Sequence, residues 1–392
     1  MKTRIEAPAN PAVLSWARRT SGLEVDDAAR KAQVNPERVA AWESGESSPT
    51  INQLRRLADI YRRPLAVFFL AVPPSDEPLP SDYRRFTSEA ALRLSPELRA
   101  AIRLAQARRQ AILELYDDLG EDPPRLTLVA QLRQGPEEVG ARLRSAMRPQ
   151  PEKMGARSVL GAWRTAAEDA GVLVFQADRI DVDEMRGFSI SDRPLPAVVL
   201  NMQDAPQART FTLLHEVAHI LLGTAGLCAL EELGPNTQIK RVEVFCNHVA
   251  GAALVPARSL LGEPEVPKKG AGEIADGALV ALARRYGVSA EVIVRRLLAL
   301  GRVNAAFYQR KRAEFQQQYR DLRRRRRAGF APPPVLAVAR NGRSFTRRVL
   351  EAFDEDRITA SDIADLLGVR LKHLDRIRMV VQAPSEIDED AE

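Results

Sequence analysis

Two of the four histidines in this chain lie in one pentapeptide, His215-Glu216-Val217-Ala218-His219. This is the H-E-x-x-H pattern, in which two imidazoles bind a metal and the glutamate acts as a base. Residues four apart share one face of a helix, so His215 and His219 can offer two nitrogens to the same cation. Glu216 lies one step round the helix and can reach a water molecule beside that cation. The spacing therefore predicts metal-assisted hydrolysis.

A catalytic zinc takes three protein ligands, so a third ligand is needed. We expect it to be Glu243, on the next long helix over residues 239–254. His248 follows five residues later, about 140° round the helix, and cannot easily face the same ion. Asn247 shares the face of Glu243, and we expect it to hydrogen-bond a ligand. Zn²⁺ is the expected metal and Mn²⁺ the alternative, since a His/His/Glu site admits both.

Two other interpretations of the pentapeptide stay open. The match could arise by chance in a core helix, or the metal could be structural, which would leave Glu216 without a role. Cys228 and Cys246 are the only cysteines. They imply no disulfide framework, and we expect buried apolar residues rather than ligands.

The segments around the pentapeptide read as a small mixed domain. Hydrophobic patterning predicts helices over 97–119, 136–147, 156–170, 206–223 and 239–254, and two more over 278–300 that break at Gly287. Strands are expected over 172–175, 185–191 and 197–201. We expect the strand Ala197–Asn201 to offer a free edge to an extended substrate.

Residues 10–70 read as five short helices, with Asn10 as an N-cap and a sharp turn over 33–35. A helix, a turn and a second helix with supporting helices are the layout of a helix-turn-helix domain. Trp42 is expected in the core, and Glu43 is expected to order the following turn. The alternative is a small bundle used for dimerisation.

Two stretches resemble known families. Residues 39–46 (VAAWESGE), with Pro49-Thr50-Ile51 and residues 54–58, resemble the phage-repressor-like (XRE) family. Residues 211–219, with Glu243-Val244-Phe245-Cys246-Asn247 and residues 252–256, resemble the ImmA/IrrE family of bacterial metallopeptidases. The second resemblance implies that His215, His219 and Glu243 bind zinc and that Glu216 is the base. The first implies that the helix starting at Pro36 enters the major groove of DNA. Its candidate contacts are Asn35, Glu37, Arg38 and Ala41.

Charge is distributed unevenly. Residues 1–70 hold 11 basic and 8 acidic residues, so one copy should bind DNA weakly, and a homodimer on paired half-sites is expected. Residues 301–348 hold 14 basic residues against 2 acidic ones, with five arginines in a row from Arg323 to Arg327. This run indicates either a contact to nucleic acid or a solvated linker. The acidic tail over 385–392 is expected to be disordered.

The region after residue 301 is the hardest to interpret. Residues 347–350 and 358–374 suggest a small helical bundle, and residues 361–369 have the pattern of a second helix-turn-helix-like unit. A dimerisation or clamp domain is the alternative. No apolar run is long enough to cross a bilayer and no signal peptide is evident, so a cytoplasmic protein without a membrane segment is expected.

Together these patterns predict a multidomain, mainly α protein. We expect four parts: an N-terminal helix-turn-helix domain (1–72), a linker and helical segment (73–150), a zincin-like α+β domain with a small sheet (151–300), and a basic stretch with a C-terminal helical module (301–392). The predicted function is a DNA-binding regulator with a zinc endopeptidase that cleaves a regulatory protein, such as a repressor, in a stress or phage response. The alternative is a non-catalytic transcription factor or antitoxin that uses the peptidase fold as a sensor or to bind a partner such as a toxin.

Overall fold

The computed structural model describes residues 6–75, 94–149, 156–223, 227–228, 237–268, 272–325 and 332–383. The chain divides into two compact units, residues 1–106 and 107–392, and the division falls within one long helix, α6 (Pro96–Asp118). Residues 76–93 of the expected linker and helical segment (73–150) and the acidic tail over 385–392 lie outside the described residues. None of the described helices has the length and apolar character needed to cross a membrane.

The first unit contains the expected helices. They are α1 (Pro11–Thr20), α2 (Val25–Ala32), α3 (Pro36–Ser44), α4 (Ile51–Tyr61) and the short 3-10 helix η1 (Leu65–Phe69). Asn10 caps α1 by accepting a hydrogen bond from the Ala12 amide. Thr50 and Gln53 form a reciprocal capping box at α4. The fifth helix is therefore a 3-10 helix, and the others follow the predicted α-helical pattern.

One ion pair joins the first and third helices of this unit. Arg18 on α1 donates from Nε and Nη2 to both carboxylate oxygens of Glu43 on α3, at 2.8 and 2.9 Å. Each side chain is only 11% exposed. Glu43 was expected to order the following turn. The structure instead shows it holding α3 against α1 through this ion pair. Trp42 is fully buried in the core, as expected.

The second unit is built mainly from helices around a small sheet. The helices of its central part are α7 (Pro136–Met147), α8 (Ala156–Asp169), α9 (Pro206–Leu221), α10 (Thr237–Leu254), α11 (Ala257–Leu261), α12 (Asp276–Tyr286) and α13 (Ala290–Ala299). The strands are β1 (Leu173–Ala177), β2 (Gly187–Ile190), β3 (Ala197–Asn201) and β4 (Leu227–Cys228). The predicted break at Gly287 separates α12 from α13.

The described sheet has the strand order β1-β3-β2-β4. β1 runs parallel to β3, and β2 is antiparallel to both β3 and β4. β3 is therefore an interior strand with partners on both sides. The expectation that Ala197–Asn201 offers a free edge to substrate is wrong, because Val199 pairs with Phe175 on one side and Phe188 on the other.

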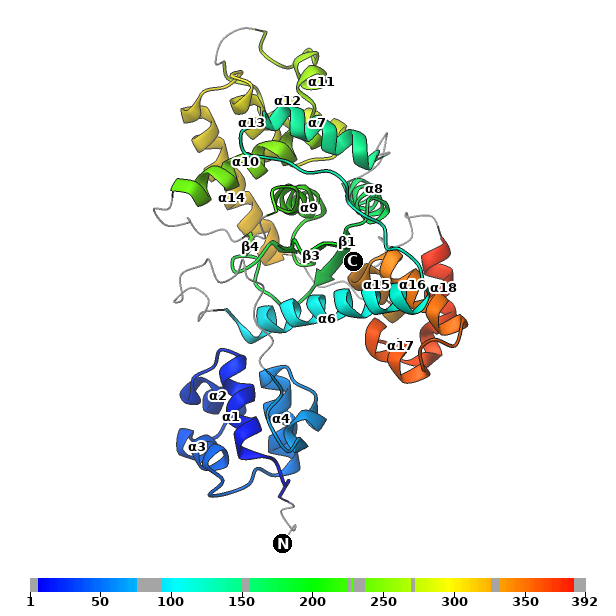
Figure 1. The fold of residues 1–392 in the computed structure, drawn as a ribbon. Coiled ribbons are helices and arrows are strands. Elements are labelled where there is room, and N and C mark those ends of the chain that lie inside the picture. Colours follow the sequence, from blue (N-terminus) through cyan, green and yellow to red (C-terminus); the bar gives the residue numbers. More distant parts are fainter. Residues whose placement is uncertain are drawn as a thin grey trace. The chain divides into compact units, whose positions relative to one another are not determined.

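Helices cover both faces of this sheet (Figure 1). α8 and α9 pack on one face, where Val174, Val198 and Leu200 join the core. On the other face, the ring of Phe175 meets Phe345 edge-on at 5.5 Å, and the Arg108 guanidinium lies 5.6 Å from its centroid. α10 packs against α9 on the side away from the sheet.

The described residues of the C-terminal part form helices joined by short turns. It comprises α14 (Ala305–Arg325), α15 (Pro333–Asn341), α16 (Arg343–Asp354), α17 (Ala360–Leu367), η3 (Leu371–His373) and α18 (Leu374–Gln382). α14 includes the first three residues of the run Arg323–Arg327, and 326–327 lie outside the described residues. The interpretation of the start of this run as a linker is therefore replaced by the end of a long helix.

Replacing Glu43 by Gln should destabilise the first unit, because it leaves the mostly buried Arg18 guanidinium without its counter-charge. We expect the free energy of unfolding of this unit to fall by about 3 kcal/mol. The amide exchange rates of α1 and α3 should then rise about a hundredfold. Hydrogen exchange read by mass spectrometry on the full chain measures this. Glu46→Gln is the control, since Glu46 is exposed and has no ion pair among the described residues. Equal protection in the two variants would contradict the role assigned to Glu43.

Candidate metal centre

The H-E-x-x-H pentapeptide lies in the middle of α9, the most deeply buried helix of the second unit. Pro206 occupies the first turn of α9, and every residue from Thr212 to Leu221 is buried. His215 and His219 are 1% and 3% exposed. Their burial is unusual for polar side chains and has to be offset by specific partners.

Three side chains converge on one point between α9 and α10. The Nε2 atoms of His215 and His219 lie 3.1 Å apart. The two carboxylate oxygens of Glu243 lie 3.2 Å from His215 Nε2 and 3.2 Å from His219 Nε2. This is the ligand set predicted from the sequence, and in the part of the chain that the structure describes these three residues form a group that could hold a metal ion.

This arrangement fits a tetrahedral cation. Donor atoms bonded to zinc at about 2.0–2.1 Å lie about 3.3 Å from one another, close to the separations seen here. Two imidazole nitrogens and a carboxylate facing one another also need a positive charge between them. Glu243 is 25% exposed on its side chain, so solvent reaches the centre from the side of α10.

Glu216 lies beside the three donors and is fully buried. Its Oε2 accepts a hydrogen bond of 2.8 Å from the Ser189 hydroxyl on β2. Its Oε1 has no hydrogen-bond partner among the described residues, and neither does His215 Nδ1. One oxygen is thus held in place, and the other is available to accept a proton.

Burial and hydrogen bonding shift the acidity of these groups. Burial raises the pKa of Glu216 above the ordinary carboxyl value. Burial would lower the pKa of His219, but hydrogen bonds with Cys246 and Glu243 outweigh it and hold this pKa well above its usual value. Burial would raise the pKa of Glu243, but hydrogen bonds from His215 and His219 outweigh that effect and lower it.

A glycine brings β2 close enough to α9 for this contact. A Cβ atom at Gly187 would lie 2.5 Å from the Thr212 methyl carbon and 3.6 Å from Cγ of Glu216. Ser189, two residues further along β2, faces the same side as Gly187 and so reaches Glu216. Ser189 was not among the residues predicted from the sequence, although a polar residue in a buried strand was a signal.

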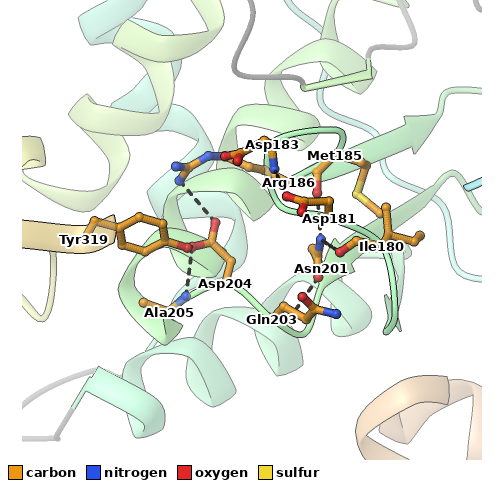
Figure 2. Close-up of polar contacts among 10 residues, drawn as sticks. All are labelled: Ile180, Asp181, Asp183, Met185, Arg186, Asn201, Gln203, Asp204, Ala205 and Tyr319. Atoms are coloured by element: carbon orange, nitrogen blue, oxygen red, sulfur yellow. Dashed lines mark hydrogen bonds and ion pairs between the residues drawn. The ribbon is translucent and has the colours of Figure 1, made fainter. Parts of the chain in front are cut away.

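A second polar cluster fixes the start of α9 (Figure 2). The fully buried Asp204 accepts hydrogen bonds from the Tyr319 hydroxyl at 2.7 Å and the Ala205 amide at 2.9 Å. Its other oxygen accepts from Arg186 Nη1 at 3.1 Å. Arg186 directly precedes Gly187, and Ala205 is the N-cap of α9. This carboxylate therefore joins the beginning of β2 to that of α9, and both to α14.

The neighbours of Glu243 on α10 have different roles. Cys246 is buried and hydrogen-bonded to His219, outside the group of three ligands. Nε2 of His248 lies 2.6 Å from Oε1 of Glu137 on α7. His248 is therefore paired with Glu137 and is not part of the metal centre. Asn247 makes no side-chain hydrogen bond within the described structure, so its predicted contact to a ligand stays a prediction.

The candidate DNA contacts gather at the start of α3. Asn35, Glu37 and Arg38 are exposed and line an open hollow of about 550 Å³ together with Gln33, Val34 and Gln53. Ala41 lies half-buried one turn further along the helix. The structure thus places three of the four residues on one surface.

Comparison with known families finds a match in each of two segments of the chain. Residues 167–298 match the IrrE N-terminal-like domain, the Peptidase_M78 family, and residues 14–68 match a helix-turn-helix family. The chain therefore carries the predicted fusion of an XRE-type helix-turn-helix to an ImmA/IrrE-type domain. His215, Glu216, His219 and Glu243 all fall in the first match. No curated protein matches the chain.

Metal binding should release about one proton near pH 7, because a cation needs neutral imidazole and His219 has a raised pKa. The apparent affinity should therefore rise with pH, about tenfold per unit, until the pH passes the His219 pKa. Calorimetric titration of Zn²⁺ in two buffers of different ionisation enthalpy measures the proton count. His219→Ala should lose tight binding, and His248→Gln, a histidine on the ligand helix α10, should keep it. Binding without proton release at pH 7 would argue against this centre.

Proposed function

We propose that this chain is a DNA-binding regulator with a zinc-dependent endopeptidase that cleaves a regulatory protein, such as a repressor, in a stress or phage response. The convergence of His215, His219 and Glu243 beside the buried Glu216 carries this proposal. A structural metal site would not need a carboxylate with one free oxygen next to the ligands. Hydrolysis gives that carboxylate a role.

Each residue of the centre has a distinct task in this reaction. His215, His219 and Glu243 would hold a zinc ion, which would supply Lewis acidity toward a peptide carbonyl and favour the ionisation of water. Glu216 accepts the proton of the attacking water on its free oxygen and delivers it to the leaving amine. Its raised pKa suits this exchange, because a base with a pKa nearer to neutrality both accepts and returns a proton readily. Ser189 fixes the carboxylate orientation.

The substrate should approach from the side on which Glu243 meets solvent. Since β3 is interior, β4 is the outer strand of the described sheet nearest to β2 and Glu216. An extended segment of the substrate would add to β4 through backbone hydrogen bonds. Cleavage is then expected in an exposed, extended loop of the regulatory protein.

DNA binding would bring the peptidase to its site of action. The exposed start of α3 supports this role for the first unit, and its small positive surplus favours a homodimer on paired half-sites. The arginines that begin in the last turn of α14 would add contacts to phosphate.

Glu216→Gln should lower the cleavage rate about a thousandfold, because the amide cannot take up the proton. Zinc affinity should change little, since Glu216 is not a ligand. Multiplexed mass spectrometry of a protein-derived peptide library with the zinc-loaded chain measures the rate. Ser189→Ala, which leaves the carboxylate but removes its hydrogen bond, should lose less activity.

Two outcomes would contradict the proposal. One is equal cleavage by Glu216→Gln and the native chain. The other is an unchanged regulatory output in cells that carry Glu216→Gln, which would favour the non-catalytic regulator.

A further inference from the structure

The C-terminal module, α16 to α18, lies outside the residues that the two families match. Its middle helix and the turn after it repeat the geometry of the N-terminal helix-turn-helix. α2 and α17 each have eight residues. Each is followed by a residue in the left-handed conformation, Gln33 (φ 58°, ψ 47°) and Gly368 (φ 67°, ψ 37°). The next helix begins three residues after it in both modules, at Pro36 and Leu371.

The hydrogen bonds of the two turns also agree. The Val34 amide donates to the Ala29 carbonyl at 3.0 Å, and the Val369 amide donates to the Ala364 carbonyl at 3.0 Å. Val34 and Val369 are 335 residues apart in the sequence, and so are the two acceptors, Ala29 and Ala364. Adding 335 to a residue number of the first module therefore gives the corresponding residue of the second module through the turn.

Burial follows the same offset. Three inward positions of the first module, Ala28, Ala32 and Trp42, correspond to Ile363, Leu367 and Ile377, and all six are buried. Two others, Ala29 and Val39, are buried, and their counterparts Ala364 and Leu374 are half-buried. The second module thus packs the same positions of its two helices into its own core. α16 contacts both α17 and α18, which places it as the supporting helix.

An ion pair recurs at the same place with its charges exchanged. In the first module Glu43 on α3 pairs with Arg18 on the supporting helix α1. At the position of Glu43 the second module has Arg378, which donates to both oxygens of Asp354 on α16 at 2.5 Å. In both modules an ion pair therefore joins the second helix to the supporting helix, mostly buried in the first module and more exposed in the second.

The outward positions differ between the modules in charge. Asn35, Glu37, Arg38 and Ala41 correspond to Arg370, Lys372, His373 and Arg376. Arg370, Lys372 and Arg376 are exposed and form no ion pair within the described chain. Asp375, also exposed, occupies the position of Ala40, which is not among the candidate contacts.

We propose that residues 343–382 form a second helix-turn-helix that binds the phosphate backbone of duplex DNA through Arg370, Lys372 and Arg376. These positions of the second module carry three cations and no carboxylate, which suits a polyanion. The corresponding positions of the first module include the acidic Glu37 and suit it less well.

The same turn also joins α12 to α13 through Gly287, so it points to DNA only in combination with the buried positions and the ion pair. That combination favours DNA over an acidic protein, because it presents one helix face to the major groove and its phosphates. One chain would then carry two DNA-binding surfaces.

The test uses the full chain and a 30-base-pair duplex of random sequence, with affinity followed by fluorescence anisotropy across a range of salt concentrations. The variant combines Arg370→Ser, Lys372→Ser and Arg376→Ser. The control removes the same charge from exposed positions elsewhere, with Arg258→Ser, Lys268→Ser and Arg284→Ser.

Each phosphate contact contributes about 0.9 to the slope of log affinity against log salt. The variant should therefore lose about 2 to 3 from the slope and at least about tenfold in affinity at 0.15 M salt, and the control should lose neither. Arg370→Lys with Arg376→Lys should retain most of the binding. Equal slopes and affinities for variant and control would overturn the proposal and would leave this surface to an acidic protein.

Circular dichroism of the variant separates a lost contact from a lost fold. A parallel variant of the first module, Asn35→Ala with Arg38→Ala, should lower affinity independently of the C-terminal substitutions. If that variant alone abolishes all binding and salt dependence, the second module contributes nothing and the proposal fails. The peptidase proposal is unaffected by either result, since no residue of the metal centre is changed.

Discussion

Two imidazole nitrogens and a carboxylate lie within 3.2 Å of one another, an arrangement that a shared positive charge stabilises, and the centre of the second unit is organised around it. α9 is buried along most of its length, so its two histidines need polar partners there. α10 supplies Glu243 from outside the sheet. The Asp204 cluster and the close approach at Gly187 then fix α9 and β2 so that Glu216 lies next to the donors.

The sequence predicted the parts of this centre that depend on local geometry. The four-residue spacing of His215 and His219 is a property of one helix. Glu243 was predicted as the third ligand because it lies on the next long helix. The contact of Ser189 with Glu216 could not be predicted, because it depends on strand order and on how closely β2 approaches α9. The same limit explains the error over Ala197–Asn201, since a short apolar run rich in valine indicates a strand but not which strands lie beside it.

Helix boundaries in the first unit were predicted well, because caps and prolines are encoded locally. The role of Glu43 was not, since its partner Arg18 lies 25 residues earlier. At the C-terminus, the pattern of residues 361–369 indicated a helix-turn-helix-like unit without deciding between DNA binding and dimerisation. The conformation of Gly368 and the ion pair Arg378–Asp354 align this unit with the N-terminal helix-turn-helix. That alignment places its outward residues at the positions of the candidate DNA contacts.

X-ray absorption spectroscopy of the zinc-loaded full chain tests the central claim most directly. Nitrogen and oxygen scatterers should surround the metal at about 2.0–2.1 Å, with the outer-shell signature of two imidazoles. One imidazole should disappear in His215→Ala, and both should persist in Glu216→Gln. A spectrum with no more than one imidazole, or with sulfur at about 2.3 Å from a residue such as Cys246, would contradict the arrangement on which this account depends.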